Sequence, residues 1–225
     1  MTGPIGALYV QKAASSDEGP RARAAEEKCL FLAGYTDAYD GPVSRRGARK
    51  GTAPVIYTIG HSTRPIEDFI RLLESNGIRR LIDIRTIPKS RHNPQFNADT
   101  LPASLGNAGI DYVHMKELGG LRRARADSPN AGWRNVSFRG YADYMQTPAF
   151  EDALARAVEL AREKPTALMC AEAVPWRCHR SLVADALTVR GIEVFEVIGP
   201  SAPKVHKLTP FARVRGKQIR YLAEG

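Results

Sequence analysis

The feature that most constrains this fold is a regular alternation of short apolar runs with amphipathic helical segments, which starts at Val55. The short runs, rich in β-branched or aromatic residues as strands are, span 55–59, 80–84, 110–114, 166–170 and 192–198. Segments with helical periodicity lie between them, at 65–75, 99–105, 148–162 and 177–190. Strands separated by helices imply a parallel sheet covered on both faces. We therefore predict an α/β fold with an open, doubly wound, flavodoxin-like parallel sheet.

The alternation also predicts the domain boundaries. Residues 55–199 form the α/β domain, and residues 1–54 mix Gly, Pro, Ser, Ala and charges around one apolar patch at 29–32, which indicates an irregular extension. Residues 200–225 carry six basic residues against one acidic one, more than half of the net charge of +9, and are predicted to be a basic tail. Such a tail suits contact with nucleic acid or another polyanion, or serves only solubility.

Several classes of protein are disfavoured by what the sequence lacks. No uncharged apolar run approaches the roughly 20 residues that span a bilayer, and the first residues do not have the pattern of a secretory signal. We therefore expect a cytoplasmic protein with no membrane partner. The three cysteines have no CxxC spacing, and no HxxxH or HExxH pair occurs, so the sequence assigns neither a disulfide framework, nor a metal ligand, nor a cofactor.

Polar side chains follow the predicted strands at the points where the strands end. These residues are His61 and Ser62, Asp83 and Arg85, His114, and Cys170 with Glu172. The carboxyl ends of parallel strands share one edge of the sheet, where loops and helix amino termini form ligand sites. We therefore expect these side chains to line one cleft, together with Cys178, His179 and Arg180 from the start of the last helix.

Chemical roles can be assigned to several of these residues. Cys170 ends a strand before a helix amino terminus, which lowers a thiol pKa and favours a nucleophile more reactive than Cys29 and Cys178; the alternative is a buried packing thiol. Glu172 is a candidate general base or a loop cap. The remaining predicted roles are acid–base chemistry for His61 and Asp83, and anion binding for Arg85, Arg91 and Arg180, whose guanidinium groups suit phosphate or carboxylate.

Residues 118–141 carry five arginines against one aspartate, with Trp133, Phe138 and Tyr141 among them. Basic residues interleaved with aromatic ones suit the binding of stacked bases and phosphates. Alternatively, the segment is a solvated loop whose aromatic side chains fold back onto the core. The sequence leaves both interpretations open.

Several short motifs in the domain resemble those of the domain-of-unknown-function family number 488. They are Thr58-Ile59-Gly60-His61-Ser62, Asp83-Ile84-Arg85 with Pro88 and Ser90, Leu118-Gly119-Gly120, Tyr141, Cys170-Ala171-Glu172 and Cys178-His179-Arg180. The resemblance covers roughly residues 55–199 and implies the α/β fold and the position of the site, with Tyr141 beside it. It implies no substrate.

Three functions remain compatible with these residues. The leading hypothesis is an enzyme that acts on a phosphorylated or otherwise anionic substrate, a nucleotide or nucleic acid. The second is a noncatalytic nucleic-acid-binding module, and the third is a metal-dependent hydrolase. Composition does not separate them, because all three favour arginine and histidine in a cleft.

A first prediction concerns residues 1–54, whose composition does not support a core of its own. A chain that begins near Thr52 should melt close to the temperature of the full chain in a calorimetric scan. A large drop in melting temperature would instead show that the apolar patch at 29–32 docks on the domain.

Overall fold

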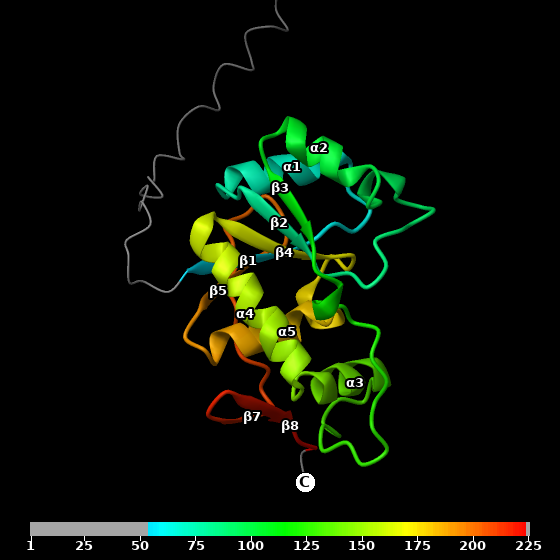
Figure 1. Cartoon of the computed structure of the whole chain (residues 1–225), viewed down its shortest axis with the longest axis vertical. Helices are drawn as coiled ribbons and strands as arrows, with labels where there is room; N and C mark the ends of the chain where they lie inside the picture. The colour runs from blue at the N-terminus through cyan, green and yellow to red at the C-terminus, as the bar shows by residue number, and fades with distance from the viewer. Residues whose placement is uncertain (1–53, 224–225) are drawn as a thin grey trace, which may run out of the picture. The chain divides into compact units, whose positions relative to one another are not determined.

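A six-stranded sheet forms the centre of the computed structural model, which describes residues 54–223 (Figure 1). The strand order is β3-β2-β4-β1-β5-β6. Five strands are parallel: β1 (Val55–Gly60), β2 (Arg80–Asp83), β3 (Asp111–His114), β4 (Thr166–Cys170) and β5 (Glu193–Val197). The short β6 (Lys204–Val205) pairs antiparallel with β5.

Helices cover both faces of this sheet. On one face lie α1 (Ile66–Ser75) and α2 (Leu101–Asn107), and on the other α3 (Val136–Tyr144), α4 (Pro148–Glu163) and α5 (Arg180–Thr188). Single turns of 3₁₀-helix span Pro94–Phe96, Lys116–Leu118 and Pro175–Arg177. The parallel α/β class expected from the sequence is therefore confirmed.

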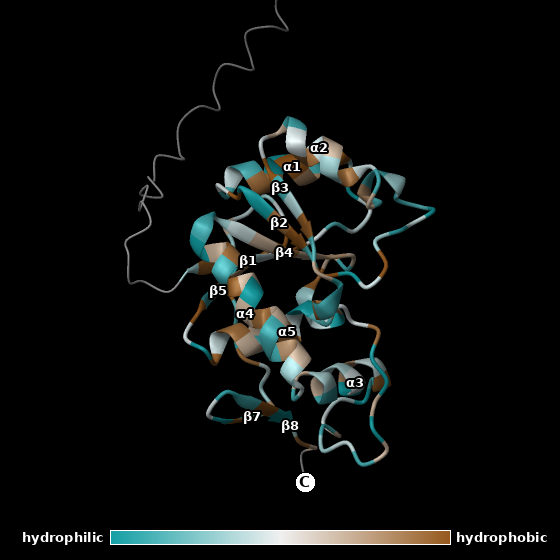
Figure 2. Cartoon of the chain, in the orientation of Figure 1, coloured by the Kyte–Doolittle hydropathy of each residue, from teal (hydrophilic) through white to brown (hydrophobic). Residues whose placement is uncertain are grey.

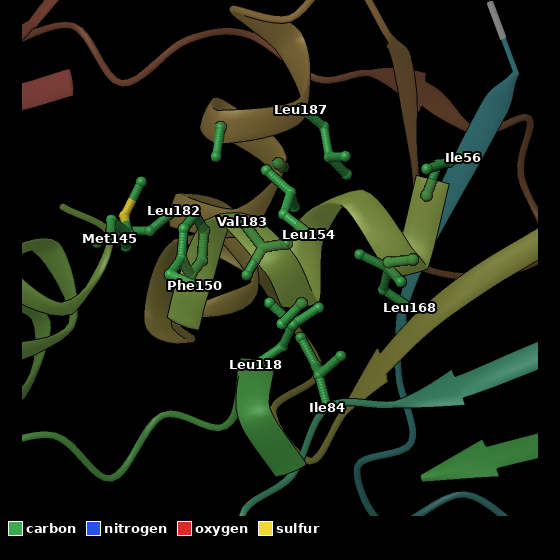
Figure 3. Close-up of a cluster of buried hydrophobic side chains, with 14 of the residues drawn as sticks. Ile56, Ile84, Leu118, Met145, Phe150, Leu154, Leu168, Leu182, Val183 and Leu187 are labelled. Carbon is green, nitrogen blue, oxygen red and sulfur yellow. The ribbon is translucent and has the colours of Figure 1, made fainter. Parts of the chain in front are cut away.

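Two hydrophobic cores result from the pleat of the strands, which sends successive side chains to opposite faces. Ile56 and Leu168 pack with α4 and α5, as Figure 3 shows, whereas Ile59 and Met169 pack with α1 and α2. The first core also receives Leu118 from the connection that follows β3. Residues adjacent in a strand thus belong to different cores. The same alternation determines to which face of the sheet each polar residue at a strand end points.

Local signals explain the helix starts. The side chain of Thr147 accepts a hydrogen bond from the Phe150 amide at the start of α4, where Pro148 occupies the first turn. Asn135 caps α3 in the same way through the Ser137 amide. Figure 2 shows hydrophobic and hydrophilic bands alternating along α4, as expected for a helix with one buried side.

The strand order differs from the flavodoxin order of 2-1-3-4-5. Here β4 lies between β1 and β2, so the chain moves outward through β2 and β3 and then returns to the middle of the sheet. All five residues of β4 are buried, which fits a strand paired on both edges and covered on both faces. The alternation of strands and helices along the sequence does not determine this strand order.

The segment expected as a basic tail is folded onto the domain. A hairpin of β7 (Ala212–Arg215) and β8 (Gln218–Tyr221) follows β6, and Ile219 and Tyr221 belong to the core on the α3–α5 face. The buried Asp185 carboxylate of α5 accepts hydrogen bonds from the His206 ring, the Tyr221 hydroxyl and the Thr209 amide. The basic side chains of the hairpin face solvent, while Ile219 and Tyr221 of β8 alternate with them and point inward. The net charge of this segment therefore did not reveal that it folds.

Residues 1–53 lie outside the described part, and the expected extension with its patch at 29–32 falls among them. Within residues 54–223, no helix has the length and apolar character needed to cross a bilayer.

A second prediction follows from His206, whose two ring nitrogens meet Asp185 at 2.8 Å and Glu196 at 2.7 Å. Burial alone would lower the pKa of His206, but the two carboxylates outweigh it and raise the pKa to about 9. The unfolded pKa is about 6.5, so this contribution to stability is complete below pH 6.5 and is lost as the pH rises through 9.

Urea denaturation should therefore show a free energy of unfolding that falls between pH 6.5 and pH 9. His206→Gln should remove that part of the fall, and His92→Gln, at an exposed position, should retain it. Equal pH profiles for the wild type and His206→Gln would contradict the assignment.

Candidate functional site

A polar pocket lies at the carboxyl ends of β1, β2 and β4, where the residues after each strand meet. The helices that follow β1 and β2 cover one face of the sheet, and the helix that follows β4 covers the other. Adjacent strands whose connections leave toward opposite faces create a crevice between them. The pocket has a volume of about 560 Å³, and its polar lining includes His61, Ser62, Arg85, Lys89, Glu172 and Arg177.

The Arg85 guanidinium is held firmly in the pocket wall. Its Nε and Nη2 donate to the two oxygens of Asp83 at 2.9 and 2.6 Å, and Nη2 also donates to the Phe96 carbonyl at 2.7 Å. Asp83 is fully buried and accepts two more hydrogen bonds, from the Arg85 amide and the Tyr112 hydroxyl. These hydrogen bonds hold the planar guanidinium in one orientation.

His61 is buried against this arginine in one definite tautomer. Its Nδ1–H donates to the Ser62 carbonyl at 2.8 Å, so Nε2 accepts from Arg85 Nη1 at 3.2 Å. The ring stacks on Phe96 with the centroids 4.3 Å apart. Burial, aided by the Arg85 charge, lowers the pKa of His61 to about 4, so the imidazole is neutral at neutral pH.

The backbone at this end of β1 has an unusual conformation. Ser62 has φ +52°, the one positive value for a non-glycine among the described residues. The neighbouring Gly60 has no room for a side chain, because a Cβ would lie 1.7 Å from the Glu172 carbonyl oxygen. The turn after β1 is therefore shaped by the loop after β4, and it places Ser62 in the pocket lining.

A second polar cluster lies on the opposite face of the sheet. It consists of Cys170, Cys178 and His179, with the imidazole Nδ1 3.8 Å from the Cys170 sulfur and 3.7 Å from the Cys178 sulfur. Both cysteines belong to the core on the α3–α5 face. The Tyr141 ring packs on the imidazole at 4.9 Å, while its hydroxyl donates to the Leu118 carbonyl.

The two thiols differ in their surroundings. The nearby Cys170 side chain lowers the pKa of Cys178, as do the Arg180 charge and the Arg180 amide, which donates to the Cys178 sulfur at 3.4 Å. The Cys178 side chain and burial raise the pKa of Cys170. The amide and the charge of Arg180 thus favour Cys178 as the thiolate.

The structure divides the predicted site residues rather than placing them in one cleft. His61, Ser62, Arg85 and Glu172 line the pocket, with Asp83 buried directly behind Arg85. Cys170, Cys178, His179 and Tyr141 form the opposite cluster. The division arises because Gly60, and not His61, pairs with Cys170. Since successive side chains of a strand point to opposite faces of the sheet, His61 and Cys170 lie on different faces.

Three further predicted residues lie outside both groups. Arg180 is buried and donates to the carbonyls of Glu172 and Ala173, so it supports the loop and does not line the pocket. His114 is exposed, and its Nε2 donates to the Arg85 carbonyl. Arg91 is exposed beside the pocket without lining it.

Sequence reasoning missed some residues of the site. Lys89, Asn93 and Arg177 line the pocket, and Tyr112 donates to Asp83. Lys89 belongs to a run of basic residues with Arg85 and Arg91, and the alternation within β3 places Tyr112 on the α1–α2 face. Neither signal distinguishes these residues from ordinary surface groups. No sequence signal indicated that Gly120 lies against the His179 ring.

The fold and this pocket define a doubly wound α/β protein with a polar crevice at the carboxyl edge of its sheet. The family model described as "Domain of unknown function DUF488" matches residues 65–187. The chain belongs to this DUF488 family, as its motifs indicated. Neither a curated protein nor a solved structure matches the chain significantly.

A third prediction concerns Asp83, which is fully buried and accepts four hydrogen bonds from Arg85 and Tyr112. Asp83→Ala leaves the Arg85 charge without its partner, and breaking a buried pair in this way costs about 3–5 kcal/mol. Chemical denaturation should record that loss. The matched control is Asp127→Ala, which breaks the exposed Arg125–Asp127 pair and should change stability little. Equal effects of the two substitutions would contradict this view of Asp83.

Proposed function

We propose that the pocket binds a phosphorylated or otherwise anionic small molecule, such as a nucleotide, and that the protein is an enzyme acting on it. The observation that carries the proposal is the Arg85 guanidinium, fixed in the pocket wall by Asp83, Phe96 and His61. Arg85 has five N–H donors, and these contacts leave one Nη1 hydrogen uncommitted. A preorganised charged donor binds an anion without the entropy cost of ordering a long side chain.

The charge and size of the pocket support the same ligand class. Lys89 and Arg177 are exposed side chains in its lining, and Glu172 is the acidic residue among them. The basic groups therefore exceed the acidic ones around the opening. A volume of about 560 Å³ lies within the range of roughly 300–1,000 Å³ typical of sites for small molecules.

In the enzymatic form of this proposal, the side chains of the pocket have distinct roles. Glu172 is exposed in the lining and takes the role of general base. His61 is neutral and accepts a hydrogen bond from Arg85 Nη1 at Nε2, so it orients the anion-binding group. Cys170 lies on the other face of the sheet and has no part in this pocket.

A nucleic-acid-binding module receives less support from the arginine-rich segment. Trp133 packs against Phe138, Phe211 and Tyr221, so these aromatic faces are engaged within the protein instead of being free for bases. Arg122 covers the Tyr144 ring at 3.6 Å and donates to backbone carbonyls of its own loop. A small-molecule ligand is therefore the form we favour.

A fourth prediction tests the pocket with inorganic pyrophosphate and AMP as probes, measured by titration calorimetry. Arg177→Gln and Lys89→Gln should each weaken binding by roughly tenfold or more, because a hydrogen bond to a charged group contributes about 1.5–3 kcal/mol. Both side chains are exposed, so the melting temperature should change little. Adenosine, which lacks the phosphate, should bind more weakly than AMP.

The matched control is Arg213→Gln, which removes an equal charge from the exposed face of β7. It should leave pyrophosphate and AMP binding unchanged. An equal loss of affinity in Arg213→Gln would assign the binding to net charge and remove the argument for the pocket. Tight, strongly salt-dependent binding of nucleic acid by all three variants would favour the module instead.

A further inference from the structure

The cluster of Cys170, Cys178 and His179 is left unexplained by the anion pocket, because it lies on the other face of the sheet. Its three potential ligand atoms lie within 4.8 Å of one another. They come from the end of β4 and from the two residues before α5, so two separate chain segments converge on one point. Both cysteines are buried, and His179 is half-buried.

The distances fit the requirements of a tetrahedral zinc ion. Zinc binds sulfur at about 2.3 Å and histidine nitrogen at about 2.0–2.1 Å, which places a sulfur and a nitrogen about 3.6 Å apart in a tetrahedron. The His179 Nδ1 atom lies 3.8 Å from the Cys170 sulfur and 3.7 Å from the Cys178 sulfur. Both nitrogen–sulfur distances thus need to shorten by only one or two tenths of an ångström, and the two sulfurs lie within 4.8 Å of each other.

The histidine tautomer is already the one that a metal needs. The Nε2–H of His179 donates to the Ile84 carbonyl at 3.2 Å, which leaves the lone pair on Nδ1, the atom that faces both sulfurs. A backbone carbonyl that accepts from the far ring nitrogen is a common outer partner of metal-bound histidine, because it fixes the ring orientation. Tyr141 packs against the same ring and restrains it further.

The backbone of Gly120 packs on the face of the same imidazole. A Cβ on Gly120 would lie 2.5 Å from Nδ1, 2.8 Å from Cγ and 3.0 Å from Cε1 of His179, which is over the ring and away from the in-plane lone pair. Any side chain at position 120 would therefore displace the His179 ring. Glycine at this position, like Tyr141, helps to keep the ring in place.

We propose that Cys170, Cys178 and His179 bind a zinc ion through two sulfurs and Nδ1. Two thiolates and an imidazole form a donor set that suits zinc over magnesium or calcium, which prefer oxygen. Binding displaces the two thiol protons to solvent. Within residues 54–223 the cluster has three members, so these side chains supply three of the four ligands of a tetrahedral ion.

This site is independent of the proposed anion pocket, and its test uses the full chain with the metal alone. The reduced, chelator-treated protein is titrated with cobalt(II), which reports thiolate ligands through intense charge-transfer absorption. One equivalent should saturate the signal, and zinc should then displace cobalt. Cys178→Ser and His179→Ala should each weaken cobalt binding at least tenfold, whereas Cys29→Ser, the same chemical change outside the described residues, should leave it unchanged.

A second measurement on the wild type guards against variants that fail to fold. Alkylation of the native protein, read by mass spectrometry, should modify Cys170 and Cys178 more slowly with zinc bound than after chelation. Chelation should also lower the melting temperature, because an ion that binds only the folded state stabilises it.

Three outcomes would overturn the proposal. They are the absence of a thiolate charge-transfer band in the reduced wild type, an unchanged band in Cys178→Ser, and a Cys170–Cys178 disulfide that forms readily and equally with and without zinc. The last result would assign the pair to thiol redox chemistry.

Discussion

The parallel register between β1 and β4 determines the chemistry of the carboxyl edge. Gly60 lies opposite Cys170, and the hydrogen bonds continue past the strands from the His61 amide to the Cys170 carbonyl. Because the side chains of a strand alternate between faces, Cys170 enters the α3–α5 core while His61 enters the α1–α2 side. A single edge of the sheet therefore carries two polar clusters that the sheet itself separates.

The end of β2 supports both clusters at once. Asp83 and Arg85 point toward the pocket, and the carbonyl of Ile84 between them accepts from His179. The buried Arg180 holds the loop after β4 by donating to the Glu172 and Ala173 carbonyls, and it forms no ion pair among residues 54–223. Carbonyl acceptors thus replace a carboxylate as its partners, which keeps the loop beside the pocket in place.

Periodicity in the sequence predicted the five parallel strands, four of the helices and the edge of the sheet that carries the polar residues. It did not predict the strand order or the face of each residue, because both depend on the insertion of β4 beside β1 and on their register. The sequence did not predict helix α3, because the many arginines of residues 118–141 indicated a loop. It did not predict that residues 204–221 fold onto the domain, because their positive charge indicated a tail. In both segments, burial of a few residues such as Tyr141 and Tyr221 outweighs a mainly polar composition.

The separation of the clusters limits the reactions that the pocket can support. A covalent mechanism requires the nucleophile to contact the substrate, with reacting atoms about 3–3.5 Å apart. An anion held by Arg85 lies on the α1–α2 side of the strand ends, whereas the Cys170 sulfur is buried within the α3–α5 core. In the function proposed above, chemistry on that anion therefore uses groups of the pocket lining, such as Glu172. For the two thiols and His179 we propose the separate role of binding a metal.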